Sequence, residues 1–329
     1  MKRKHKLSFL LIGLLLSIGC GQPDKGNSEP TEAEVPVKVR IGYLPIAAGL
    51  PLFVAVDKGY FKEAGFDVEL TRFASSNDLG TAATTGQVDA LMPFALNAGF
   101  DIGGASGKRH KLFGLNIYSD QAPHIVDYMV ARRGSGIKTL ADLRGRKVAG
   151  FPGSVTKVFV ENILEQNGVK PGEYTYVALA PPEWLAALQS GAVDAASVME
   201  PQASMITGKG IATVVVPGFF AKLMPDVPLS GHWLAAQFVE SRDPTVSARF
   251  TEVFDRAVDY IRAYPEDAKQ SYVMHIGIES GALAAIQLNN WVKSTEMQPA
   301  KVKPFADLLW SKHAIQAEVD VTEYMLSGH

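Results

Sequence analysis

The sequence has a single cysteine, Cys20, so no disulfide can form within the chain. None of its seven histidines is spaced from another as in a metal site, so we expect neither a metal nor another cofactor. Basic residues (32) and acidic residues (34) nearly balance and are dispersed, so the charged surface that nucleic-acid binding requires is not expected. The apolar run from Leu7 to Gly19 is shorter than the ~20 residues that a membrane-spanning helix needs.

What stands at the start is a basic segment, an apolar run and then Cys20, an order that predicts an export signal over residues 1–19. The stretch "LLSIGC" resembles the lipobox of bacterial lipoproteins, although Ser17 stands where that pattern prefers Leu. The resemblance implies that Cys20 carries a lipid and anchors the protein on the extracytoplasmic side of a bacterial membrane; cleavage with complete release is the alternative. Residues 20–36 are polar and rich in Pro, Gly and acids, which predicts a disordered tether.

The remaining residues, about 290, are enough for two domains. Alternating and helical periodicities follow each other in β-α-β-α-β order, which predicts an α/β fold with parallel strands. The pattern starts again after Gly136. The predicted strands are 37–45, 66–73, 87–94, 146–151, 174–179 and 192–199. The predicted helices are 49–65, 75–86, 137–145, 154–168 and 181–191.

One motif occurs twice. "TGQVDALMP" at 85–93 and "SGAVDAASVMEP" at 190–201 each end a helix at Gly and enter a strand through Val-Asp-Ala. The repeat predicts two similarly built lobes. From Asp243 on the sequence has helical patterns, which predict a tail that packs on the first lobe, with segments 125–132 and 233–236 as hinge strands. The predicted limits are 37–127 plus 233–329 for lobe 1 and 128–232 for lobe 2.

The segments "IGYLP", "PLFVAVDKGYFKEAGFDVEL", "IKTLADLRGRKVA" and "GAVDAASVMEP" resemble type II solute-binding proteins of ABC importers. The similarity is strongest to the sulfonate, nitrate, taurine and thiamine-precursor group, and it covers about residues 38–310. The resemblance implies a two-lobed periplasmic-binding-protein fold. It also implies a receptor without catalytic activity, which closes as a monomer on a small solute and delivers it to the permease and ATPase subunits of an importer.

The glycine turn "GFPGSVTK" at 150–157 lies between a predicted strand and a predicted helix. Its spacing does not fit a phosphate-binding loop, and the second Gly of a nucleophile elbow is missing after Ser154. The remaining interpretation is a helix N-terminus at the edge of a sheet, where ligands bind in open α/β folds. Gly153 would let a solute approach the backbone, and Ser154 and Thr156 would offer hydroxyls; in the alternative, Ser154 only caps its own helix.

Further ligand-binding candidates lie on the loops after strands and at the predicted hinge. They are Tyr43, Pro45, Ser76, Asn77, Phe94, Asn97, His124, Glu200 and Trp233. Each has a structural alternative. The aromatic rings of Tyr43, Phe94 and Trp233 are equally suited to packing, Ser76 and Asn77 to helix capping, and His124 to an exposed position.

Glu200 ends an apolar strand before Pro201, so we expect its carboxylate to project into the cleft. A desolvated carboxylate would repel an anion, and no Arg stands on the predicted cleft loops. The sequence therefore favours a heteroaromatic solute similar to a thiamine precursor. The alternative is a small anion such as an alkanesulfonate, taurine or nitrate, with Glu200 in a structural role. Two alternatives of another class are a sensor and a pyrimidine-making enzyme of the same fold, which would need a cysteine-rich motif.

Overall fold

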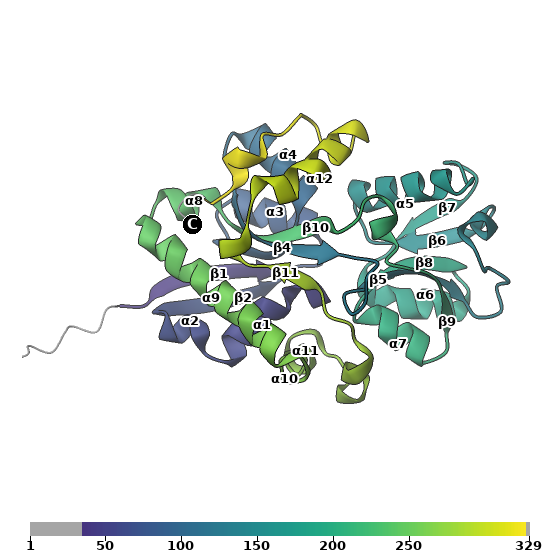
Figure 1. Cartoon of the computed structure of the whole chain (residues 1–329), viewed down its shortest axis with the longest axis horizontal. Coiled ribbons are helices and arrows are strands. Elements are labelled where there is room, and N and C mark those ends of the chain that lie inside the picture. Colours follow the sequence, from purple (N-terminus) through teal and green to yellow (C-terminus); the bar gives the residue numbers. More distant parts are fainter. Residues whose placement is uncertain (1–34, 327–329) are drawn as a thin grey trace, which may run out of the picture. The chain divides into compact units, whose positions relative to one another are not determined.

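The computed structural model describes residues 35–326 of the chain. The predicted signal segment, Cys20 and all but the last two residues of the predicted tether lie outside the described residues. The residues from Pro36 on form one compact unit, built around two β-sheets with helices on their faces (Figure 1). None of the helices in the described part of the chain is long and apolar enough to cross a membrane.

The first sheet has six strands in the order β11-β4-β10-β3-β1-β2. Its strands are β1 (Val37–Tyr43), β2 (Phe66–Arg72), β3 (Ala90–Ala95), β4 (Lys111–Tyr118), β10 (Val227–Leu234) and β11 (Asn290–Val292). β1 runs parallel to β2 and β3, whereas β10 is antiparallel to both β3 and β4. The alternation that predicted β1 buries Val39 and Ile41 on the core side.

The second sheet has five strands in the order β7-β6-β8-β5-β9. Its strands are β5 (Asp127–Arg132), β6 (Lys147–Gly150), β7 (Thr175–Ala178), β8 (Ala195–Met199) and β9 (Ala212–Pro217). β6 is parallel to β7 and β8, and β5 is antiparallel to β8 and β9. The fold class expected from the sequence, two α/β lobes of similar construction, is confirmed.

The chain passes from the first sheet to the second between β4 and β5, and returns between β9 and β10. β5 lies wholly in the second sheet, and β10 already pairs in the first sheet from Val227 on. The crossing segments are therefore 119–126 and 218–226 rather than 125–132 and 233–236. The predicted lobe limits, 37–127 plus 233–329 and 128–232, stay a prediction. The sheets to which β5 and β10 belong suggest limits within the two crossing segments.

Helices α1 (Leu50–Asp57) and α2 (Tyr60–Glu63) replace the single helix predicted over 49–65. The break comes at Gly59, which has a φ of +74° that favours glycine. Helices α3 (Ser76–Thr84), α4 (Leu96–Ser106), α5 (Ser154–Gln166), α6 (Trp184–Ser190) and α7 (Gln202–Gly208) follow strands of the two sheets.

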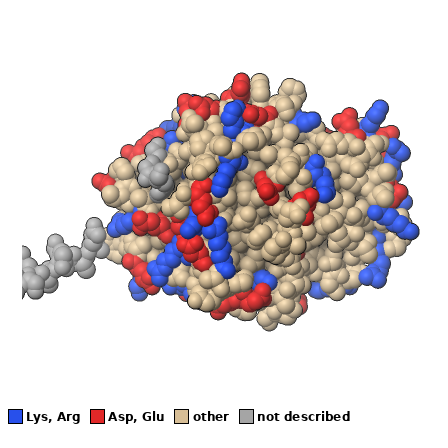
Figure 2. Space-filling model, in the orientation of Figure 1, with Lys and Arg blue, Asp and Glu red and all other residues tan. Residues whose placement is uncertain are grey.

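The tail contains α8 (Ala236–Glu240), α9 (Pro244–Ala263), α10 (Pro265–Ala268), α11 (Ser271–Ile276) and α12 (Pro299–Ser311). α9 packs against α1 and α2, so the tail covers the first sheet as expected (Figure 1). The expectation of helical structure from Asp243 on is wrong at Asn290–Val292, which forms β11 and pairs with β4. On the face seen in Figure 2, Lys and Arg side chains are interspersed with Asp and Glu.

Candidate functional site

An inner cavity of about 80 Å³ lies where strand ends and helix starts of the two sheets meet. The first sheet and its loops contribute Leu44, Ser76, Asn97, Tyr118 and Ser230, and the second contributes Phe151, Thr156, Phe159 and Met199. Phe220, on the returning crossover, also faces it. None of the described residues that line this cavity carries a charged side chain.

Three helices begin at the inner cavity. Ser76 is the first residue of α3, Asn97 lies in the first turn of α4, and Thr156 lies in the first turn of α5. The first-turn N–H groups of an α-helix have no acceptor within the helix, and its N-terminus has a partial positive charge. The N-cap positions of α4 and α5 are Ala95 and Gly153, which make no side-chain cap hydrogen bond. The first turns of α4 and α5 therefore have backbone N–H groups without a side-chain cap, whereas Ser75 caps α3 by accepting from the Asp78 N–H at 3.2 Å.

An outer cavity of about 280 Å³ adjoins the inner one and shares Leu44, Ile46 and Phe151 with it. Pro181 and Pro182 line it from the second lobe, and Phe73 lines it from the first. Arg72, at the end of β2, is the one charged residue among the described residues of this lining. The inner cavity is small and has five polar residues (Ser76, Asn97, Tyr118, Thr156 and Ser230) in a mostly apolar lining, and the adjoining outer cavity is larger and more apolar.

The structure brings Ser76, Asn97 and Thr156 together at the inner cavity, and it places Pro45 at the outer one. Tyr43 packs edge-on against Phe53, with ring centroids 5.5 Å apart, and faces neither cavity. Asn77 is exposed in the first turn of α3. As ligand contacts, these residues stay predictions.

The glycine turn has the predicted geometry. Gly153 takes a φ of +134° immediately before α5, a conformation that favours glycine, and a Cβ added there would meet no atom within 4 Å. Its backbone therefore faces open space. Ser154 opens α5 as expected, but its side chain is outside the described part of the structure.

His124 does not reach the inner cavity. It lines a separate cavity of about 530 Å³ next to Leu288, and its Nδ1 lies 3.0 Å from the carbonyl oxygen of Leu288. Because that hydrogen bond ties the first crossing segment to the tail, the imidazole has a structural partner.

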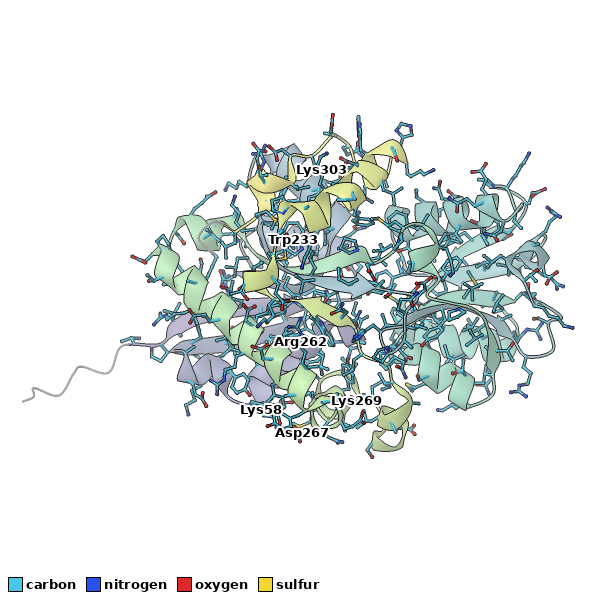
Figure 3. The ribbon with its side chains drawn as sticks, viewed as in Figure 1. Lys58, Trp233, Arg262, Asp267, Lys269 and Lys303 are labelled. Atoms are coloured by element: carbon cyan, nitrogen blue, oxygen red, sulfur yellow. The ribbon has the colours of Figure 1, made fainter. Side chains whose placement is uncertain are left out.

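Phe94 and Trp233 are corrected as candidates for the cleft wall. Both side chains are fully buried within the first lobe, with ring centroids 6.3 Å apart, and neither lines a cavity described here. Trp233 lies on β10 within the first lobe (Figure 3), and a Cβ on Gly99 of α4 would come within 2.6 Å of its ring. The glycine in α4 thus makes room for the indole, and both aromatic residues belong to the core.

The expectation that Glu200 projects into the cleft is also wrong. Glu200 is 2% exposed, and its carboxylate accepts hydrogen bonds from the backbone N–H of Ser204 at 3.2 Å and from its hydroxyl at 2.8 Å. Burial raises the pKa of Glu200 to about 7. The carboxylate therefore bonds to the first turn of α7, and the electrostatic objection to an anionic ligand no longer applies.

Sequence reasoning missed Tyr118 and Ser230, which line the inner cavity from β4 and β10. The segment "KLFGLNIY" was not recognised as a strand, although Asn116 and Tyr118 are polar residues within an apolar run. Burial raises the pKa of Tyr118, so its hydroxyl stays protonated. It lies 3.8 Å from the sulfur of Met199.

Comparison with known proteins gave three informative matches. The model of the "NMT1/THI5 like" family matches residues 48–268. A putative aliphatic sulfonates-binding protein of Bacillus subtilis is 26% identical over 97% of this chain and 94% of its own. The structure of an alkanesulfonate-binding protein from Xanthomonas axonopodis pv. citri, bound to MOPS, superposes with a TM-score of 0.72 at 18% identity, over 89% of this chain and 99% of that one.

The same comparison found an enzyme. A 4-amino-5-hydroxymethyl-2-methylpyrimidine phosphate synthase of Saccharomyces cerevisiae is 23% identical over 71% of this chain and 69% of its own. The proteins similar to this chain therefore include sulfonate-binding proteins and a pyrimidine phosphate synthase.

Proposed function

Because the chain belongs to the NMT1/THI5-like family, we propose that it is the solute-binding subunit of an ABC importer and that its solute is a small organic anion of the aliphatic sulfonate class. This proposal reverses the order of the two ligand hypotheses drawn from the sequence. The sulfonate-binding relatives favour a sulfonate over a thiamine precursor. Because Glu200 is buried, its carboxylate no longer argues against an anionic ligand in the cleft.

The observation that carries the proposal is the convergence of three helix N-termini on an uncharged cavity. Backbone N–H groups at helix starts bind anions without a basic side chain. The hydroxyls of Ser76, Thr156 and Ser230 and the amide of Asn97 add donors around the same space. A sulfonate presents three oxygens that only accept, which matches the hydroxyl and amide donors among the lining residues.

The sizes of the two cavities support a ligand with a small head and an apolar tail. The inner cavity of about 80 Å³ is far smaller than the ~300–1,000 Å³ of pockets for drug-sized ligands, so it suits a head group of a few atoms. The outer cavity is mostly apolar and suits an alkyl chain. Arg72 at its rim attracts anions towards the entrance.

We propose binding without catalysis. The described residues of the inner cavity include the hydroxyls of Ser76, Tyr118, Thr156 and Ser230 but no His, Cys, Asp, Glu or Lys that would activate a hydroxyl as a nucleophile. The only cysteine of the sequence, Cys20, precedes the described residues.

We further propose that the protein works outside the cytoplasm as a monomer and is held to the membrane by a lipid on Cys20. The support is the order of basic segment, apolar run and cysteine at residues 1–20. Fractionation tests it: the parent protein should sediment with membranes, and a Cys20→Ala variant should not be lipidated. A parent protein that lacks the acyl mass after export would refute the lipid anchor.

Thermal denaturation with a ligand panel tests the solute class. The panel contains ethanesulfonate, taurine, nitrate and a hydroxymethyl pyrimidine. A ligand at a hundredfold excess over its Kd stabilises the native state by ~2.7 kcal/mol, which is easily measured. We expect ethanesulfonate to give the largest increase in melting temperature; a response to the pyrimidine alone would overturn the proposal.

A further inference from the structure

Three buried polar side chains, His232, Asn116 and Ser230, form a hydrogen-bonded relay from the core of the first sheet to the inner cavity. The His232 Nε2 atom lies 3.0 Å from Asn116 Oδ1, and Asn116 Nδ2 donates to Ser230 Oγ at 3.0 Å. Asn116 and Ser230 are directly paired across β4 and β10, and His232 follows two residues later on the same face of β10. Only Ser230, at the end of this relay, lines the cavity.

The direction of these hydrogen bonds depends on which imidazole nitrogen carries the proton. An amide that turned over would donate to His232 and accept from Ser230, so the distances alone fit both directions. The Nδ1 atom of His232 decides between them. It is buried and has no hydrogen-bond partner within the described part of the chain. A proton on Nδ1 would leave an orphaned buried N–H, which is rarer in proteins than an unused acceptor.

The proton therefore lies on Nε2, which donates to Asn116 Oδ1. The imidazole is neutral, since burial lowers the pKa of His232 to about 3. Its ring is held against Phe254, with centroids 4.5 Å apart. A Cβ on Gly114 would come within 2.6 Å of the Phe254 ring, so the glycine makes this packing possible.

With Asn116 fixed by His232, its Nδ2 always donates to Ser230. One of the two lone pairs of the Ser230 oxygen is then occupied. Because Asn116 takes no proton from it, the Ser230 O–H is left to donate to a ligand in the cavity or, without one, to the neighbouring Tyr118 hydroxyl. We propose that His232 and Asn116 are positioning residues that hold the Ser230 hydroxyl as a donor, so that the site selects head groups that accept hydrogen bonds over those that donate them. This inference rests on the proposed function and specifies how the site distinguishes a sulfonate from its neutral analogue.

Titration calorimetry on the full folded protein tests the relay with two probes of similar shape. Ethanesulfonate has an acceptor-only head, whereas ethanesulfonamide carries N–H donors. Ser230→Ala should weaken ethanesulfonate binding about tenfold, the effect of one hydrogen bond to a charged group, and should change ethanesulfonamide binding less than twofold.

A double-mutant cycle separates the relay from a general structural role of the buried histidine. His232→Leu frees the Asn116 amide to turn, so ethanesulfonate binding should weaken about fivefold. His232→Gln, whose amide can donate in place of Nε2, should stay within about twofold of the parent.

The decisive comparison is between two backgrounds. In a Ser230→Ala background, His232→Leu should have almost no further effect on ethanesulfonate binding. In a Ser76→Ala background, which removes a cavity hydroxyl outside the relay, its effect should persist in full. An equal loss with and without the Ser230 hydroxyl would overturn the relay.

Nitrogen-15 NMR of the unliganded parent protein provides an independent test that needs neither a ligand nor a variant. The relay requires the Nε2–H tautomer of His232, unchanged between pH 5.5 and 8. Finding the Nδ1–H tautomer would refute the relay even if sulfonates bind tightly. Conversely, a protein with the Nε2–H tautomer that binds no sulfonate would refute the proposed function and leave the direction of the relay intact.

Discussion

The two halves of the molecule repeat one strand order. β2-β1-β3-β10-β4 of the first sheet corresponds to β7-β6-β8-β5-β9 of the second, with the same parallel and antiparallel pairs. The Val-Asp-Ala motif has the same role in both. Asp89 Oδ2 accepts the Arg40 N–H at 2.9 Å before β3, and Asp194 Oδ2 accepts the Lys147 N–H at 3.0 Å before β8.

The halves differ in what surrounds this repeated frame. The tail helices cover the first sheet, and the large core extends from it to one face of the second sheet, where it includes Val148 and Ala195. The other face of the second sheet has a small separate core around Trp184. The offset of 105 residues between the motifs places Glu200 at the position of Ala95. The second half therefore has a buried acid where the first has a small residue that lines the cavity. The strand order is the same in both halves, whereas the residues around the strands differ.

The largest expected effect comes from the two tryptophans. Trp184 and Trp233 are both fully buried, and each indole N–H donates to a backbone carbonyl, that of Leu179 and that of Phe94. Trp184→Ala and Trp233→Ala should each lower the free energy of unfolding by about 4 kcal/mol through lost burial and a residual cavity.

Hydrogen exchange shows whether the halves are independent. Trp184→Ala should lower amide protection chiefly in β5 and β8, and Trp233→Ala chiefly in β3 and β4. If either variant lowers amide protection equally in both sheets, the two halves unfold as one unit. Their stabilities are then not independent.

The second expected effect is a pH dependence that comes from one buried carboxyl group of the second half, Glu200. Burial raises the pKa of Glu200 from 4.5 to about 7, so the native state retains its proton where the unfolded chain has lost it. Its contribution to stability is fully present below pH 4.5 and is lost as the pH rises through 7. The loss is on the order of 3 kcal/mol at ~1.4 kcal/mol per pKa unit.

Glu200→Gln removes this titration, and its amide oxygen can still accept from Ser204. Urea denaturation should therefore find the variant more stable than the parent at pH 8 and similar to it at pH 4. The matched change in the first half, Ala95→Gln, introduces no titrating group and should leave the slope of stability against pH unchanged. A Glu200→Gln variant that is no more stable than the parent at pH 8 would contradict the assignment.

The third prediction compares the two aspartates of the repeated motif. Asp89 also pairs with the Arg40 side chain through Nε at 3.0 Å and Nη2 at 2.8 Å, whereas the nearest cation to Asp194 is Arg132 at 3.6 Å. Asp89→Ala should lower the free energy of unfolding by about 2 kcal/mol and Asp194→Ala by about 1 kcal/mol. Both changes leave a backbone N–H without its acceptor, but only Asp89→Ala also removes a two-bond (forked) ion pair with an Arg side chain. Equal losses in chemical denaturation would mean that the fork contributes nothing.

The repeat itself was readable from the sequence, because local periodicity and the Gly-x-Val-Asp-Ala motif are short-range signals. β11 was not, since three residues, Asn290–Val292, form a strand only by pairing with β4 far away in the chain. The same limit applies to the site. Ser76, Asn97 and Thr156 follow predicted strands or begin predicted helices, but Ser230 and Tyr118 reach the cavity only through long-range pairing of β10 with β4.

Glu200 shows a different limit. Its position at the end of β8 was predicted, but whether its carboxylate faces the cleft or the start of α7 depends on a rotamer, which spacing does not reveal. No Arg was expected on the cleft loops, but Arg72 lines the outer cavity, whereas the described lining of the inner cavity includes none. Reasoning from side chains alone also left out the backbone N–H groups at the starts of α4 and α5, which can bind an anion without a basic residue.

The smallest effect tests whether both halves hold the ligand. Ser76, on α3, and Thr156, on α5, line the inner cavity from opposite halves. Ser76→Ala and Thr156→Ala should each weaken ethanesulfonate binding about fivefold, which corresponds to ~1 kcal/mol and to one lost hydrogen bond. Calorimetry measures this, with Ser106→Ala and Ser190→Ala, exposed at the ends of α4 and α6, as controls that should bind like the parent. A loss in only one of the two cavity variants would mean that the solute is held by one half, and that the other half serves to cover it.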